Sequence, residues 1–174
     1  MPKFPRNRME NMPDPATDIA SLLEHCRTLI LATLDVNGNP QASPAPFIHD
    51  RDNRFHVLVS TMAPHTAHMI ALKPTGVMLI ENENDALHIF ARRRLNYVCN
   101  VSEVFRDQYN YDEQIEKFKD RFGSFASALA NLPDFHMFSL YPASGRLVVG
   151  FGRAYRIKDD IITSIGPEDV APKS

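Results

Sequence analysis

The sequence predicts a mainly β protein in which about seven strands form one antiparallel sheet, with one long helix and two short helices beside it. Period-two alternation of apolar and polar residues recurs along most of the chain, and short polar turns separate most of the alternating segments. Strands that are joined by short turns pair antiparallel. Because closure into a small barrel would remove the exposed edges of such a sheet, we expect a barrel.

Length and composition favour one globular domain. The chain has 174 residues, 44% hydrophobic and 23% charged, which is enough apolar material for a core without disulfides. Cys26 and Cys99 lie far apart without CxxC spacing, so we expect free thiols and a reducing compartment. The net charge of −2 argues against a general nucleic-acid binder. No apolar run has the length of a membrane span or the pattern of a secretory signal, so we expect a cytoplasmic protein.

The start of the chain differs in composition from the rest. Residues 1–14 contain prolines and charges but little that could be buried, and we expect a flexible N-terminal arm. Asp14 followed by Pro15 is typical of a helix start. The barrel domain is expected over residues 15–160, and a short C-terminal tail over residues 161–174.

Seven segments alternate with the period of a strand, and they cover residues 28–34, 40–48, 55–60, 76–80, 95–101, 135–141 and 147–157. Asn37 and Gly38 predict a tight hairpin between the first two. Pro44 and Pro46 indicate an edge or a bulge, because proline cannot donate a hydrogen bond to a neighbouring strand. Gly145 is expected to break the chain between the last two strands.

The long helix is predicted to begin after Asn110. Its apolar residues recur at steps of four and three and form one continuous stripe, made of Tyr111, Ile115, Phe118, Phe122, Phe125 and Leu129. A shorter helix is expected from about Pro64 to the residues before Pro74.

The segment from Ser60 to His68 is a candidate phosphate site. A strand ends there in two hydroxyls, Ser60 and Thr61, just before the helix that begins near Pro64. Unpaired backbone N–H groups and the helix dipole favour anions at such a point, and His65 and Thr66 of the first turn could add donors. The alternative is an ordinary helix start with solvated side chains. His65 and His68 are also spaced for one metal ion, but no third ligand has suitable spacing, so we expect no metal site.

Two further groups could bind a polar ligand. Arg92 and Arg94 share one face of a strand entry, which suits a phosphate or the polar edge of a flavin. The alternative is that these arginines pair with the nearby acidic residues. Arg27 and Thr28 stand at the start of the first strand and could hydrogen-bond the edge of a planar ligand, although such residues are more often structural.

Seven segments together resemble the haem-utilisation (HutZ/HugZ) branch of the FMN-binding split-barrel superfamily that includes pyridoxamine 5'-phosphate oxidase. In chain order they read RTLILAT (27–33), SPAPF (43–47), STMAPHTAH (60–68), FARRRL (90–95), RFG (121–123), LPDF (132–135) and GFGRAY (150–155). The resemblance implies an antiparallel split β-barrel of six to seven strands with flanking helices, a homodimer, and a cofactor cleft between the two subunits.

The resemblance also implies a cofactor and its contacts. In flavin-binding relatives the cleft holds FMN, which makes a flavin-dependent oxidoreductase with an unidentified small-molecule substrate the first expectation. Matched position by position, the expected FMN-binding residues are Arg27, Thr28, Ser60, Thr61, His65, Thr66, His68, Arg92 and Arg94. His68 stands where relatives often have asparagine. No catalytic acid or base is predicted, and a deazaflavin in place of FMN remains open.

Haem is the alternative cofactor. In haem-degrading members of the branch, a histidine near the C-terminus binds the iron, and an aspartate of the partner subunit supports that histidine. Asp134 matches the aspartate, but residues 161–174 contain no histidine, and the last histidine of the sequence is His136. A haem-binding protein would then use another ligand, for which His65 and His68 are candidates. A dimeric scaffold without a cofactor is the third alternative.

Overall fold

The computed structural model describes residues 14–71 and 74–166, so the predicted arm up to residue 13 and the last part of the predicted tail lie outside the described residues. The helices are α1 (Pro15–His25), α2 (Pro64–Ile70), α3 (Tyr111–Phe122) and α4 (Ser124–Ala130), with short 3-10 turns at Glu83–Asp85 and Ile89–Ala91. The strands are β1 (Thr28–Leu34), β2 (Pro40–His49), β3 (Phe55–Ser60), β4 (Thr75–Ile80), β5 (Arg94–Val104), β6 (Phe135–Gly150), β7 (Arg153–Lys158) and β8 (Ile161–Ser164).

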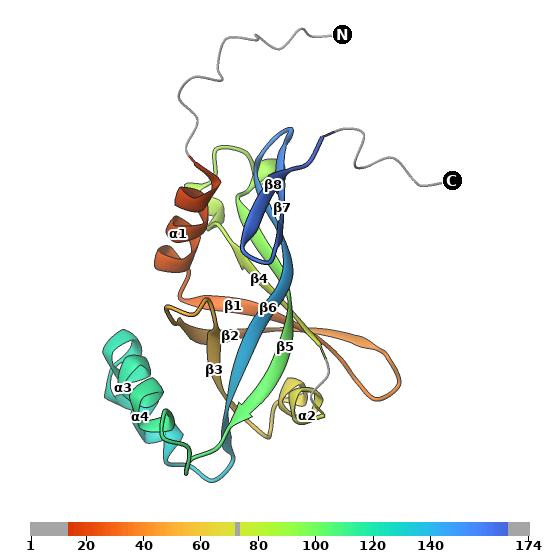
Figure 1. The fold of residues 1–174 in the computed structure, drawn as a ribbon. Helices are drawn as coiled ribbons and strands as arrows, with labels where there is room; N and C mark the ends of the chain where they lie inside the picture. The colour runs from red at the N-terminus through yellow and green to blue at the C-terminus, as the bar shows by residue number, and fades with distance from the viewer. Residues whose placement is uncertain (1–13, 72–73, 167–174) are drawn as a thin grey trace, which may run out of the picture.

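The strands form one antiparallel sheet whose order is β3-β2-β1-β4-β5-β6-β7-β8. Pairing of β3 with the first part of β6 closes six of them into a barrel, and β7 and β8 continue the sheet from the last part of β6 (Figure 1). The mainly β, antiparallel barrel predicted from the sequence is therefore confirmed. The homodimer stays a prediction.

The barrel interior holds the larger of two apolar clusters. Its fully buried side chains come from alternate positions of the barrel strands, and Leu22 of α1 and Met69 of α2 join them. Helices α3 and α4 pack beside β3, outside the barrel (Figure 1), and form a second cluster with Ile48, Leu58 and Met137. The two clusters together fix the end of β3 and the start of β6, where part of the candidate site lies.

The predicted long helix is in fact two helices. Gly123 has φ +86° and ψ 177°, a combination that side-chain-bearing residues rarely adopt, and it ends α3 and precedes α4. The change of direction removes Phe125 from the stripe, and its side chain is 72% exposed. The prediction of one continuous stripe through Phe125 was wrong, because a periodicity argument assumes an unbroken axis.

Gly145 was expected to break the chain but lies inside β6, a single strand of 16 residues. A Cβ at this position would stand 2.4 Å from Cδ1 of Tyr97, so the glycine makes room for the tyrosine ring of β5. The turn lies later, at residues 151–152, and divides the predicted closing strand between β6 and β7. Ile161–Ser164, within the predicted tail, pairs with β7 as β8.

The prolines of β2 stand where that strand has a neighbour on one side. All of β2 from Pro40 to Pro46 pairs with β1, whereas pairing with β3 begins only at Phe47. Pro44 and Pro46 therefore occupy an edge-like part of β2 within the described chain, as their missing N–H groups predict. Within the part of the chain that the structure describes, no helix is both long and apolar enough to span a membrane.

Candidate functional site

Ser60 ends β3 and is held by Asp134, the residue that matches the aspartate of the haem-degrading relatives. Ser60 Oγ donates a hydrogen bond to Asp134 Oδ2 at 2.6 Å, and the Thr61 N–H donates to the Asp134 carbonyl oxygen at 2.8 Å. Asp134 thus ties the loop before β6 to the end of β3.

Thr66 is also occupied within the chain. It is fully buried, and its Oγ1 donates to the Ser60 carbonyl oxygen at 2.6 Å. Ser60 Oγ in turn accepts from the Met62 N–H at 3.1 Å. The hydroxyls of Ser60 and Thr61 were both predicted to bind phosphate. Only the hydroxyl of Thr61, which is exposed, takes no part in this hydrogen-bonded turn. The arrangement stabilises the entry into α2.

The two histidines of α2 have different environments. His65 is 7% exposed, and neither of its ring nitrogens has a hydrogen-bond partner in the described structure. Burial, aided by the nearby His68, lowers the pKa of His65, which favours its neutral form. His68 lies closer to the surface, and its Nδ1 is 2.9 Å from Thr33 Oγ1 of β1. Ser60, Thr61, His65, Thr66 and His68 therefore do come together, around α2.

The arginines before β5 form an ion-pair network with acidic neighbours. Arg92 Nε donates to the Glu81 carbonyl oxygen at 2.9 Å, and its Nη1 pairs with Glu83 Oε1 at 3.0 Å. Arg93 pairs with Glu81 at 2.8 Å and with Asp18 of α1 at 3.3 Å. For Arg92 this is the acidic pairing left open as an alternative, whereas Arg94 Nη1 donates to the Arg92 carbonyl oxygen at 3.1 Å. The network joins α1 to the end of β4.

Arg27 and Thr28 line an open groove of about 800 Å³ between α1, the start of β1 and the end of β4. The Arg27 guanidinium lies 5.3 Å from the centroid of the Phe122 ring and donates to the Arg121 carbonyl oxygen at 3.2 Å. The groove has apolar side chains in its wall, and its lining carries both signs of charge, because Arg27 and Arg93 stand with Glu81 and Asp85.

The nine predicted residues fall into two groups within one chain. Thr28 is at one end of β1, and Thr33, which contacts His68, is near the other, five residues or about 17 Å away. Arg27, Thr28, Arg92 and Arg94 belong to the first end and the α2 residues to the second. Their roles as cofactor contacts stay predictions.

Sequence reasoning missed two polar arrangements. His56 Nδ1 lies 2.8 Å from Ser139 Oγ, and His56 Nε2 lies 2.9 Å from Asp50 Oδ2. Both His56 and Ser139 are at most 2% exposed, so this chain of groups is closed to a substrate and is structural.

The second arrangement pairs a histidine with a glutamate. His136 Nδ1 lies 2.6 Å from Glu103 Oε1 at the edge of a pocket. These residues are 33 positions apart, and only the pairing of β5 with β6 brings them together.

Among the described residues there is no group of three or more His, Cys, Asp or Glu side chains that could hold a metal ion. A cofactor that brings its own metal and most of its ligands needs only one protein ligand. The candidate ligands for a cofactor that carries its own metal are therefore histidines that are at least partly exposed and keep one ring nitrogen free.

Comparison with known proteins identifies the family of the chain. The pyridoxamine 5'-phosphate oxidase family matches residues 16–149. The haem oxygenase HutZ of Vibrio cholerae serotype O1 is 34% identical over 165 residues, which are 94% of this chain and 92% of HutZ.

Two solved structures extend the likeness to the fold. The crystal structure of HutZ from Vibrio cholerae, described as a haem storage protein, has a TM-score of 0.73 at 33% identity and covers 79% of this chain and 96% of its own. Campylobacter jejuni ChuZ has a TM-score of 0.82 at 26% identity, over 95% of this chain and 67% of its own. The chain belongs to the pyridoxamine 5'-phosphate oxidase family of split-barrel proteins, in the haem-utilisation branch that contains HutZ.

Proposed function

We propose that this protein binds haem and serves in haem utilisation, as a cytoplasmic homodimer. The observation that carries the proposal is the 34% identity to HutZ, named a haem oxygenase, across nearly the whole of both chains. When bound, haem would supply an iron centre that one protein imidazole could hold and that can carry oxygen chemistry.

The flavin-dependent oxidoreductase expected from the sequence has less support. An FMN phosphate needs free donors, but Ser60 donates to Asp134, Thr66 donates to a carbonyl oxygen, and Arg92 is paired with Glu83. Haem has no phosphate, and its carboxylates can be met by a single arginine at the edge of an apolar surface.

The dimer is supported by the outer face of the barrel. Register places Ala32 of β1, Gly76 of β4 and Val98 of β5 side by side on this face, and Val98 is 52% exposed. An exposed surface of small and apolar residues suits close approach of a second sheet.

Titration of the purified protein with haemin tests the proposal. We expect a shifted Soret band that saturates at about one haem per chain. FMN added to a parallel sample should remain free, with unquenched fluorescence. A haemin spectrum identical to that of haemin in buffer would refute haem binding. Quenching of FMN fluorescence by the protein would favour the flavin-binding function instead.

A further inference from the structure

His136 and Glu103 form a pair whose geometry leaves one imidazole nitrogen available. His136 Nδ1 lies 2.6 Å from Glu103 Oε1. An ionised carboxylate only accepts hydrogen bonds, so Nδ1 carries the proton and Nε2 keeps its lone pair in the neutral ring. Among the residues that the structure describes, none makes a hydrogen bond to Nε2 of His136.

The imidazole ring is also fixed by packing. Its centroid lies 6.4 Å from that of Phe138, with 23° between the two ring planes. The His136 side chain is 28% exposed and that of Glu103 18%, so the pair is half-buried but accessible. The hydrogen bond to Glu103 and the neighbouring Phe138 ring therefore hold the imidazole, while part of the side chain stays exposed.

The pair lies on an open pocket of about 390 Å³, within the range of small-molecule sites. Apolar and aromatic side chains form much of its wall: Val104, Phe105, Tyr111, Pro133, Phe135 and Met137. Arg106 lines the same pocket and is anchored by hydrogen bonds from its Nη2 to the carbonyl oxygens of Leu132 and Phe135. The pocket combines one imidazole, apolar walls and one fixed cation, with the carboxylates of Glu103 and Asp107 also on its lining.

These features fit haem. Histidines that bind metals commonly donate their other N–H to a carboxylate or a carbonyl oxygen, which fixes the ring and makes it a stronger ligand. One histidine suffices for haem iron, because the porphyrin supplies the in-plane nitrogens. Aromatic walls suit the macrocycle, and Arg106 suits a propionate.

We infer that His136 is the axial iron ligand for haem in this protein and that Glu103 orients it, an inference that rests on the haem-binding function proposed above. It replaces the two ligands considered from the sequence. His65 is only 7% exposed, so an iron porphyrin cannot reach it without opening α2. Nδ1 of His68 is engaged with the Thr33 hydroxyl, and the nearby carboxylate of Asp35 is coupled to His68 only through its charge.

His25 is the strongest rival within the fold. Its Nδ1 lies 2.8 Å from the Ser21 carbonyl oxygen, and it lines the larger groove that also contains Arg27. A carbonyl is a weaker acceptor than a carboxylate, and the exposed ring of His25 has no aromatic neighbour recorded in the described structure. The experiment therefore includes this residue.

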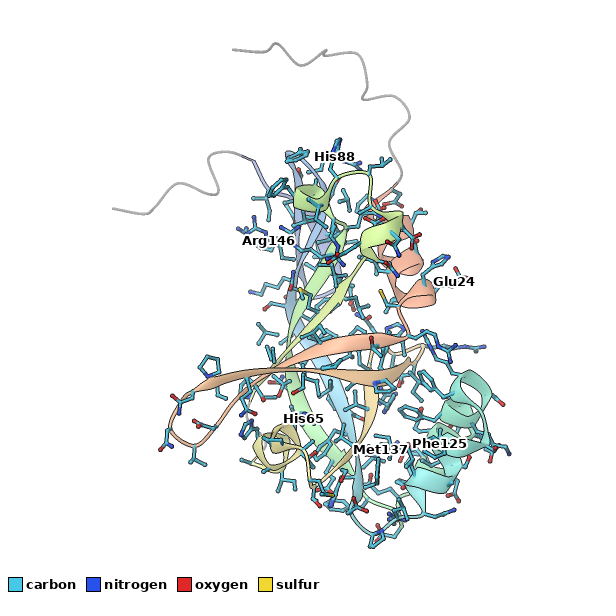
Figure 2. All side chains as sticks on the ribbon, turned by 180° about the vertical axis from the view of Figure 1, so that it is seen from behind. Glu24, His65, His88, Phe125, Met137 and Arg146 are labelled. Atoms are coloured by element: carbon cyan, nitrogen blue, oxygen red, sulfur yellow. The ribbon has the colours of Figure 1, made fainter. Side chains whose placement is uncertain are left out.

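The test is a haemin titration of the whole chain and of five variants, read by the Soret band and by the Fe–histidine stretching band of the ferrous form in resonance Raman spectra. The variants are His136→Ala, Glu103→Gln, His25→Ala, His65→Ala and, as control, His88→Ala. His88 is exposed, and Figure 2 places it toward the opposite end of the molecule from Met137, which lines the pocket.

We expect His136→Ala to lose the Fe–histidine band and to regain a histidine-like spectrum on addition of imidazole. Glu103→Gln should keep the band at lower frequency and weaken haemin binding by about 10- to 100-fold. His88→Ala, His25→Ala and His65→Ala should match the parent protein. Circular dichroism of each variant establishes that it is folded.

The two proposals fail in different ways. If the parent protein does not shift the haemin spectrum, the haem-binding function itself is wrong. If the parent binds haemin but His136→Ala keeps the Fe–histidine band, or His25→Ala or His65→Ala loses it, haem binding stands and His136 is not the ligand. Loss of the Fe–histidine band in His136→Ala, with no change in Glu103→Gln, would show that Glu103 does not orient the ring.

Discussion

Asp50, His56 and Ser139 form a buried polar chain that links the loop before β3 to β6. Burial raises the pKa of Asp50, but the hydrogen bonds from His56 and from the Arg54 backbone, with the charge of Arg54, outweigh burial and lower the pKa to about 2. Burial lowers the pKa of His56 despite the attraction of Asp50. Satisfied networks of this kind stabilise a fold, and they become costly when one partner is removed.

Asp50→Asn should therefore lower the free energy of unfolding at pH 7 by about 2 to 3 kcal/mol. A carboxyl whose folded pKa lies below its unfolded value of 3.8 contributes stability above that value and loses it as the pH falls toward 2. The difference between parent and variant should thus shrink by about half at pH 3. Urea unfolding at the two pH values measures it.

Asp52→Asn is the matched control. Asp52 lies in the same loop and also contacts Arg54, but its side chain is 71% exposed. An exposed ion pair contributes little, so we expect no measurable change in the urea midpoint. Equal destabilisation by both substitutions would contradict the role given to the buried chain.

Among the elements, the junction of α3 and α4 depends on Gly123. No atom would lie within 4 Å of a Cβ at this position, so a side chain meets no steric obstacle from neighbours. The backbone conformation, with φ +86° and ψ 177°, is the obstacle, because it is accessible almost only to glycine.

Gly123→Ala should cost about 1 to 3 kcal/mol of unfolding free energy, through backbone strain alone. Thermal unfolding, followed by circular dichroism, is the measurement. Ser124→Ala changes the exposed neighbour, which begins α4 with ordinary backbone geometry, and should stay within about 0.5 kcal/mol of the parent. A Gly123→Ala protein as stable as the parent would mean that the two helices can join into one.

At the scale of the whole molecule, the proposed dimer explains the outer face of the barrel. The β1–β2 hairpin projects from the barrel (Figure 1), and Leu34 near its tip is 45% exposed. With Ala32 of β1, Gly76 of β4 and Val98 of β5 it continues the apolar surface across three strands. A surface of this kind is characteristic of association between copies of a chain.

Val98→Glu should convert the dimer to a monomer, because a charge would be buried without a partner at the interface. Light scattering coupled to gel filtration gives the mass directly. Ile161→Glu places the same charge on β8, outside the six barrel strands, where the side chain is 67% exposed, and should remain dimeric. A monomeric parent protein, or a Val98→Glu variant of unchanged mass, would exclude this interface.

Much of the fold could be read from local patterns. Alternation located the strands from β1 to β5, and Asp14 with Pro15 marked the start of α1, because these signals act over a few neighbouring residues. Prediction failed at Gly123 and Gly145. A glycine in a sequence signals conformational freedom or space, and only the neighbours decide which of the two is used.

The candidate site shows the same division. The sequence alone determined the strands from β1 to β5, the split-barrel family and the residues that gather around α2, since each depends on local pattern or on motifs in order. Only the tertiary structure decided that Ser60 and Arg92 are engaged by Asp134 and Glu83, and that Glu103 lies behind His136. Hydrogen bonds between distant segments depend on strand register, and register is fixed by the whole barrel rather than by any one strand.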